Sequence, residues 1–258
     1  MKLNLISNNN HKIMKSILND TKDRIYFSLM LAPASTSGFN ICPSSGECER
    51  FCVSFTGHGG IPSVTQARVR KTLLFIHDRN KFFDLLEQDL CKISEHAHKQ
   101  KKQLVVRLNT FSDLAFEGIA KNLFEYWNNI LFLDYTKRQE RIKRYVKVDW
   151  PENYFLAYSH NEKSGNFSSR ALSAGIPVSF VVRRPKHIPL SIAGYQVTDA
   201  DFSDSWIIDT QSDWKKQTGT IGILKAKGKL ISSQSSFVLD SFKEIEQVLT
   251  ANELTHAV

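Results

Sequence analysis

The sequence predicts an α/β fold, a partial or complete βα barrel in a single domain over residues 1–258, with a cysteine-rich metal loop after the first strand. Short apolar runs alternate with segments of helical pattern, which is typical of parallel sheets covered by helices. Most runs lack strict apolar–polar alternation, as expected of strands buried on both faces. Polar residues follow successive runs, and in such folds functional residues gather where strands end. An open doubly wound sheet is the alternative.

The predicted elements follow from these runs and from helix signals. Apolar residues recur at three- and four-residue spacings from Phe82 to Ala97, which predicts one buried helix face. Pro62, Gly175 and Ser241 are typical of a helix start, a helix end and a helix cap. The predicted strands are residues 25–33, 104–110, 130–136, 154–160, 177–184, 205–210 and 219–228. The predicted helices are residues 62–78, 80–100, 117–129, 166–176 and 241–254.

The composition is that of a soluble globular chain of 258 residues, with 41% hydrophobic and 23% charged residues. No apolar run is long enough to cross a bilayer, and residues 1–16 lack the pattern of a secretory signal. We therefore expect a protein without a membrane partner, in a cytoplasm where thiols stay reduced. The net charge of +8 is compatible with a nucleotide or nucleic-acid partner. The oligomeric state stays open.

The loop 40–60 holds three of the four cysteines in a C-x5-C-x3-C pattern, Cys42, Cys48 and Cys52. Thiolates are soft ligands that suit zinc or iron–sulfur clusters. Because the close second pair of a structural zinc site is missing, a [4Fe–4S] cluster with one open iron is favoured. Zinc, with His58 as the fourth ligand, and three thiols without metal are the alternatives. Cys91, beside Leu90 in a helix, is predicted to be a buried apolar thiol.

Two motifs at predicted strand ends carry candidate catalytic groups. In RLNTFSD, Asn109 and Ser112 can bind a polar substrate and Asp113 can act as a base, although Ser112 and Asp113 also suit a helix cap. In LDYTK, we predict that Asp134 and Lys137 are catalytic.

Further strand-end residues are candidate substrate ligands. Tyr135 can stack on a base, and Lys137 opens a basic run that can contact phosphates. The paired guanidinium groups that follow residues 177–182 suit phosphate or carboxylate. The further predicted substrate-binding residues are Ser159, Asn161, Arg183 and Arg184.

The order of strand, cysteine loop, helix and further βα units resembles the radical S-adenosylmethionine enzymes. In that superfamily the open iron binds the amino and carboxylate groups of S-adenosylmethionine, so the resemblance implies this cofactor. The usual spacing there is C-x3-C-x2-C, and RLNTFSD stands where a glycine-glycine-glutamate motif is expected.

A closer resemblance covers residues 31–228. The segments LAPASTSGFNICPSSGECERFCVSFTGHGG, ARVRKTLLF, VRLNTFSD, LDYTK, AYSHNE and IGILKAKG resemble, in this order, the phage gene product 88 family. The resemblance implies a phage protein, hence the host cytoplasm, and one site formed by the cysteines and the strand-end residues. Together these features favour an iron–sulfur enzyme acting on a nucleotide or nucleic acid. The alternative is a nucleic-acid-binding protein with a structural zinc or iron–sulfur site and no catalysis.

Overall fold

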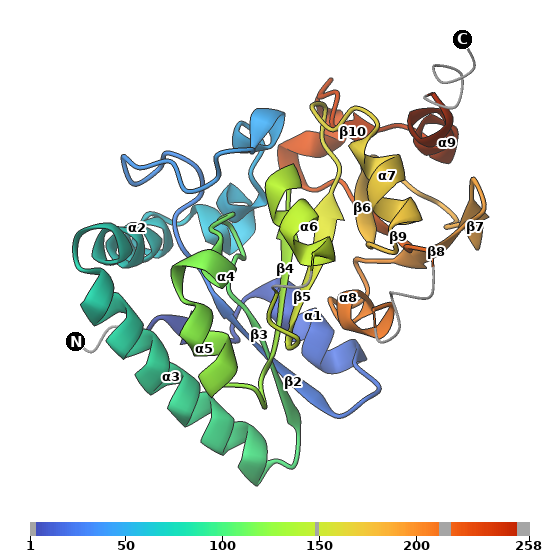
Figure 1. Ribbon diagram of the computed structural model, residues 1–258. Coiled ribbons are helices and arrows are strands. Elements are labelled where there is room, and N and C mark those ends of the chain that lie inside the picture. Colours follow the sequence, from blue (N-terminus) through green and yellow to red (C-terminus); the bar gives the residue numbers. More distant parts are fainter. Residues whose placement is uncertain (1–3, 148–149, 212–217, 252–258) are drawn as a thin grey trace. The chain divides into compact units, whose positions relative to one another are not determined.

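The computed structural model describes residues 4–147, 150–211 and 218–251 (Figure 1). The chain divides into two units: residues 1–43, 54–134 and 150–155, and residues 44–53, 135–149 and 156–258. The boundary falls inside β4 (Leu131–Thr136) and β5 (Tyr154–Ser159). Helices alternate with mostly parallel strands, which confirms the α/β class. The single domain and the barrel stay predictions.

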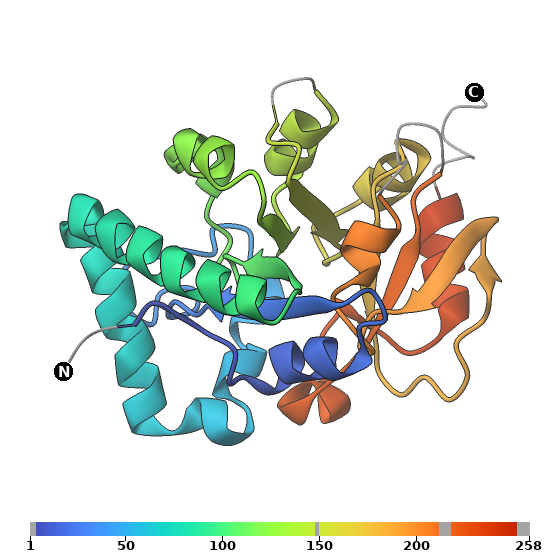
Figure 2. The ribbon, with the colours of Figure 1, turned by 90° about the horizontal axis from the view of Figure 1, so that it is seen from below.

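The first unit carries parallel strands with one antiparallel edge strand. Strands β2, β3 and the first part of β4 run parallel, and β1 pairs antiparallel with β2. In Figure 2, α1 lies on one side of β2 and α3 on the other, and all of β2 is buried. Strands covered on both faces were predicted from the missing alternation, and β2 confirms this. Besides β4 and β5, the elements of this unit are β1 (Ile6–Ser7), α1 (His11–Asn19), β2 (Arg24–Leu29), α2 (Pro62–His77), α3 (Arg79–Lys99), β3 (Gln103–Arg107), α4 (Phe116–Ile119) and α5 (Lys121–Tyr126).

Phenylalanine rings dominate the core of the first unit. Phe75 and Phe82 meet edge to face with centroids 5.1 Å apart, and Phe124 and Phe132 do so at 5.0 Å. Each ring is at most 2% exposed, and full burial of such a side chain contributes about 1.5–3 kcal/mol. The first pair joins α2 to α3, and the second joins α5 to β4, the strand that carries Asp134.

A buried carboxylate and a buried ammonium group attach β1 to the helices of the first unit. The Asp89 carboxylate accepts the backbone N–H groups of Leu5, at 2.6 Å, and Ile6, at 3.2 Å. The Lys71 ammonium donates to the Leu5 carbonyl at 2.7 Å. The Lys71 pKa is lowered to about 8, mainly by burial; the charge of Asp89 opposes this shift and the charge of Arg68 adds to it.

The second unit carries its own parallel strands. Strand β6 pairs parallel with β5, β9 and β10; β8 pairs parallel with β9, and β7 antiparallel with β8. Ser241 caps α9, as predicted, by accepting the Glu244 N–H at 3.4 Å. The further elements are α6 (Gln139–Val146), α7 (Phe167–Ser173), β6 (Val178–Val182), β7 (Ser191–Ile192), β8 (Tyr195–Asp199), α8 (Trp206–Asp209), β9 (Ile221–Lys225), β10 (Val238–Leu239) and α9 (Phe242–Thr250).

Three sequence predictions are wrong. The predicted strand 205–210 is helix α8, since the Trp206 ring packs over Gly222 and its indole N–H bonds the Tyr135 hydroxyl. A short apolar run cannot be assigned to strand or helix by periodicity alone. The predicted helix 117–129 breaks at Ala120 into α4 and α5. Cys91 lies on α3 but is exposed, because it faces away from the buried stripe.

The Lys71 site predicts a pH-dependent stability. Because the folded-state pKa of about 8 lies below the ordinary value of 10.5, the unfolded state binds more protons between these values and stability rises with pH there. The free energy of unfolding of the wild type, relative to Lys71→Met, should therefore increase by about 2–3 kcal/mol from pH 8 to 10.5.

Denaturant unfolding at both pH values measures this change. Lys92→Met is the matched control, because Lys92 also contacts Asp89, at 3.3 Å, but its side chain is 52% exposed. A difference between wild type and Lys71→Met that is constant with pH would contradict the prediction.

Candidate functional site

The buried Asp134 carboxylate organises the strand ends of the first unit. Its Oδ1 accepts the Asn109 backbone N–H and its Oδ2 the Asn109 side-chain amide, both at 2.7 Å. The Tyr154 hydroxyl also donates to Oδ2. Asp134 is 0% exposed. With donors on both oxygens, this carboxylate holds Asn109 at the end of β3, which supports a positioning role for Asp134.

The loop after β3 is built around the Asn109 side chain. Its Oδ1 accepts the Ser112 hydroxyl at 2.7 Å and the Leu114 N–H at 2.9 Å. The predicted residues Asn109, Ser112 and Asp113 thus lie in one buried turn. Ser112 and Asp113 do not cap a helix, because α4 begins only at Phe116 and no side chain caps it.

Cys42 lies against this same turn. Its thiol is within hydrogen-bond distance of the Phe111 carbonyl, at 3.2 Å, and the backbone N–H of Ala34 donates to its sulfur at 3.4 Å. The Asp113 N–H donates to the Ile41 carbonyl at 2.9 Å. Ala34 has a φ of 44°, a costly conformation for a residue with a Cβ that is retained mainly where surrounding contacts require it. The structure therefore brings one predicted metal ligand beside the predicted substrate turn.

Arg68 on α2 fixes the segment that follows the cysteines. Its guanidinium donates to the carbonyls of Ser54, at 2.8 Å, and Gly59, at 3.1 Å. It also lies over the Phe111 ring at 4.7 Å. A Cβ at Gly59 would collide with the Ser54 carbonyl, so the tight coil over residues 54–60 requires glycine there.

In the second unit, the segment that carries Cys48 is held by a group of polar contacts that we call the Glu47 cluster: Glu47, Asn161, Glu162, Ser235 and Ser236. Glu47 Oε2 accepts the Ser235 hydroxyl and the Ser236 N–H, the latter at 2.9 Å. The Ser235 hydrogen bond is the main reason that the Glu47 pKa is lowered. The Asn161 amide donates to the Ser44 carbonyl at 3.2 Å.

Glu162 completes the Glu47 cluster. Its Oε1 accepts the Glu47 N–H at 2.9 Å. A Cβ at Gly46, which has a φ of 54°, would collide with this carboxylate. Cys48 itself packs against a small apolar cluster that includes Phe237 and Val238.

Lys137 lies at the end of β4 in the second unit. Its ammonium donates to the Ser159 hydroxyl at 2.9 Å and lies 5.7 Å from the centre of the Phe237 ring. Next to Ser159, the imidazole of His160 stacks on Phe180 and pairs with Ser168. Burial, and then the charge of Lys137, lower the His160 pKa to about 4, so this imidazole is neutral at pH 7. The predicted residues Lys137, Ser159 and Asn161 thus share one edge of the second unit's sheet.

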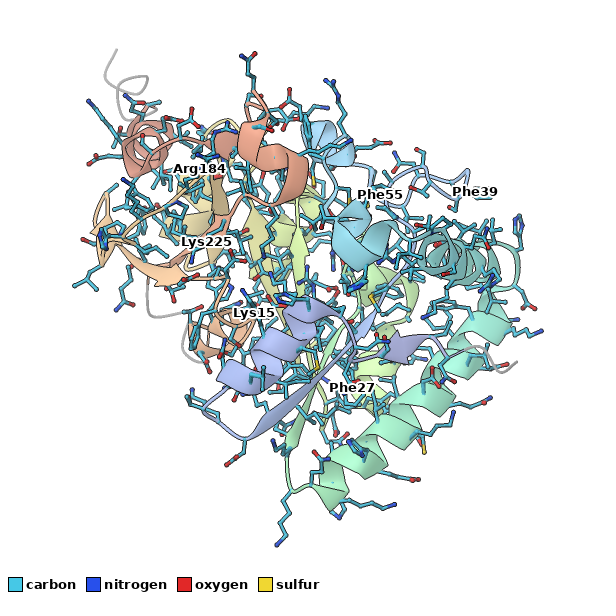
Figure 3. The ribbon with its side chains drawn as sticks, turned by 180° about the vertical axis from the view of Figure 1, so that it is seen from behind. Lys15, Phe27, Phe39, Phe55, Arg184 and Lys225 are labelled. Carbon is cyan, nitrogen blue, oxygen red and sulfur yellow. The ribbon has the colours of Figure 1, made fainter. Side chains whose placement is uncertain are left out.

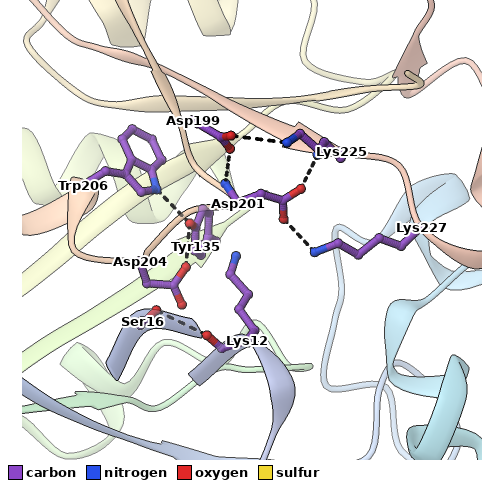
Figure 4. A network of polar contacts seen from close by, with 9 residues as sticks. All are labelled: Lys12, Ser16, Tyr135, Asp199, Asp201, Asp204, Trp206, Lys225 and Lys227. Atoms are coloured by element: carbon purple, nitrogen blue, oxygen red, sulfur yellow. Dashed lines mark hydrogen bonds and ion pairs between the residues drawn. The ribbon is translucent and has the colours of Figure 1, made fainter. Parts of the chain in front are cut away.

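The Tyr135 ring is not available for base stacking in this arrangement. Its hydroxyl donates to Asp204 at 2.9 Å and accepts the Trp206 indole N–H at 2.9 Å (Figure 4). It is 9% exposed. Stacking of Tyr135 on a substrate base stays a prediction that would require this network to open.

Acidic residues pair with the basic run 225–229. Lys225 meets Asp199 at 3.3 Å and Lys227 meets Asp201 at 2.6 Å (Figure 4). Arg183 pairs with Asp240. Arg184 is exposed (Figure 3) and has no hydrogen-bond or ionic partner among the described residues. Local carboxylates thus pair with three of these basic side chains, Lys225, Lys227 and Arg183.

The four cysteines, all within the described ranges, form no disulfide. Cys42 belongs to the first unit, and Cys48 and Cys52 belong to the second. Across residues 4–147, 150–211 and 218–251, no three His, Cys, Asp or Glu side chains converge as a metal site. Sequence reasoning missed Arg68, Glu47, Glu162 and Ser235. Only Glu162 had a local signal, since it directly follows Asn161.

Polar groups at the carboxyl ends of parallel strands define an α/β protein with a strand-end candidate site. The family model described as Gene product 88 matches residues 4–236. The chain therefore belongs to the gene product 88 family, as the motif resemblance predicted, and the match supports a phage protein. No curated protein and no solved structure gives a significant match. In the part of the chain that the structure describes, no helix is long and apolar enough to span a membrane.

Replacing Asp134 should reduce stability. In Asp134→Asn, one carboxylate oxygen becomes an amide N–H₂ donor that faces the Asn109 and Tyr154 donors, so hydrogen bonds are lost. We expect the free energy of unfolding to fall by about 2–4 kcal/mol. Tyr154→Phe removes one hydrogen bond and should cost about 1–2 kcal/mol. Chemical denaturation measures both. If Asp134→Asn unfolds like the wild type, the positioning role is wrong and a catalytic one is favoured.

Glycine at position 46 should matter more than glycine at position 38. Both residues have positive φ, but a Cβ at Gly38 meets open space whereas one at Gly46 meets Glu162. Gly46→Ala should therefore cost about 1 kcal/mol more than Gly38→Ala, the value of the Glu162–Glu47 hydrogen bond. Equal losses in thermal or denaturant unfolding would show that the Glu162 contact adds nothing.

Proposed function

We propose that this protein is an iron–sulfur enzyme that acts on a nucleotide or nucleic acid, with a [4Fe–4S] cluster bound by Cys42, Cys48 and Cys52. The observation that carries the proposal is that this loop holds three closely spaced cysteines and that none of them forms a disulfide. One of them, Cys42, receives a backbone N–H on its sulfur. Such hydrogen bonds tune cluster sulfurs in iron–sulfur proteins.

The three thiols are suitable ligands for a soft metal centre. In the described chain, however, they do not lie together as a metal site. Metal binding is often coupled to folding, because the ligands of a site are rarely together in the unfolded chain. The proposal therefore includes ordering of the loop by the cluster. S-adenosylmethionine as the ligand of an open iron, and a barrel over one domain, belong to the same proposal and rest on the radical S-adenosylmethionine resemblance.

The protein's own residues have distinct proposed roles. Lys137 and Asp113 are the catalytic candidates, and Asp134 positions Asn109. Substrate binding is proposed for the strand-end residues Asn109, Ser112, Tyr135, Ser159, Asn161, Arg183 and Arg184. The reaction would take place in the host cytoplasm.

Metal analysis after anaerobic purification tests the cluster. We expect brown protein, absorbance near ~400 nm and about four iron and four sulfide per chain. Alanine at Cys42, Cys48 or Cys52 should remove the colour, whereas Cys91→Ala, at an exposed position on α3, should retain it. Colourless wild-type protein without iron would refute the proposal.

One zinc per chain without sulfide would instead favour the alternative, a nucleic-acid-binding protein without catalysis. Its nucleic-acid affinity should then fall steeply with salt. For a cluster-containing protein, titration with S-adenosylmethionine should change the cluster spectrum. No spectral change and no heat of binding would exclude this cofactor.

A further inference from the structure

A pocket of about 490 Å³ opens in the second unit. Its lining residues follow the end of β6, belong to β10 and lie at the start of α9. Arg183, the serine-rich residues 232–236, Asp240 and Glu244 supply its polar lining. Ile231, Val238 and Leu239 also border it, the last two only 4% and 7% exposed. Its volume is in the range of small-molecule sites, which combine apolar surface with a few fixed polar groups.

The Arg183 guanidinium is held in one orientation at the pocket. Its Nη1 donates to the carbonyls of Leu230, at 2.8 Å, and Ile231, at 3.2 Å, and its Nε donates to Asp240. Among the described residues Nη2 has no acceptor, so its two N–H groups remain for a ligand. A guanidinium fixed in this way loses little further entropy when it binds.

Other polar groups of the lining also lack partners within the described chain. The side chains of Ser232 and Gln234 and the Oδ2 atom of Asp240 form no hydrogen bond there; all three residues line the pocket and are exposed to solvent, so these groups are open to a ligand. The pocket therefore offers donors from arginine, amide and hydroxyl, and acceptors from carboxylate, amide and hydroxyl.

The charge of the lining disfavours an anion. One cation, Arg183, stands against two carboxylates, Asp240 and Glu244, and the Glu47 carboxylate contacts Ser235 and Ser236 in the same segment. A phosphate only accepts hydrogen bonds at these sites and would meet these carboxylates. A sugar hydroxyl both donates and accepts hydrogen bonds, so it can use the donors and the acceptors of this lining.

We propose that this pocket binds a neutral polyhydroxylated ligand, either a free sugar or the ribose of a nucleoside. Ser232, Gln234, Asp240 and Arg183 bond its hydroxyl groups. Identification of the ligand as the ribose of the substrate rests on the proposed function, whereas the existence of a sugar site does not.

Isothermal titration and ligand-observed NMR with the full-length protein test the site, using adenosine, D-ribose, D-glucose and inorganic phosphate as probes. We expect at least one sugar-containing probe to bind, with no competition from phosphate. Gln234→Ala and Ser232→Ala should each weaken that binding about 2- to 10-fold, the value of one hydrogen bond. Gln247 also lies in α9 but outside the pocket lining. The control variant Gln247→Ala should therefore bind the probe like the wild type.

The outcomes separate the site from the proposed function. Binding of adenosine but not of free sugars identifies a nucleoside site, and comparable binding of free sugars identifies a sugar site unrelated to a nucleotide substrate. No binding of any sugar-containing probe, displacement by phosphate, or equal binding by Gln234→Ala and Gln247→Ala overturns the proposal. Metal analysis of the same preparation reports on the cluster independently.

Discussion

The buried carboxylate of Asp134 is the constraint on which the first unit's candidate site depends. A carboxylate removed from water is costly unless donors surround it. Here the donors come from the Asn109 backbone, the Asn109 amide and the Tyr154 hydroxyl. The carboxylate thereby joins the end of β3 to β4 and to the start of β5. The turn that contacts Cys42 is placed by this one group.

Local pattern was sufficient for the long helices and most buried strands. The apolar spacing of residues 82–97 and the Pro62 signal correspond to α3 and α2, and apolar runs such as 104–110 and 219–228 correspond to β3 and β9. Pattern failed for residues 205–210, whose helix is decided by packing of Trp206 on a distant glycine. It also missed β1, β7, β8 and β10, of which three are only two residues long.

The candidate site was predictable in its residue types but not in its contacts. Asn109 and Ser112, neighbours in sequence, bond each other in one turn, and Lys137 bonds Ser159. The partners of Glu47 lie 115 residues away, at Glu162, and 188 residues away, at Ser235. Nothing in local periodicity reports such pairs. The same limit applies to the basic run 225–229, since its partners Asp199 and Asp201 precede it by more than twenty residues.

The Glu47 carboxylate joins two segments that sequence places far apart, the one that carries Cys48 and the serine-rich wall next to Arg183. A shift of either segment strains the same hydrogen bonds. Such a coupling is reciprocal. If a ligand at one segment changes the affinity for a ligand at the other by some factor, the second ligand changes the affinity for the first by the same factor. The Glu47 hydrogen bonds are thus the direct contact through which a ligand at the serine-rich wall and a ligand at the Cys48 segment would influence each other's affinity.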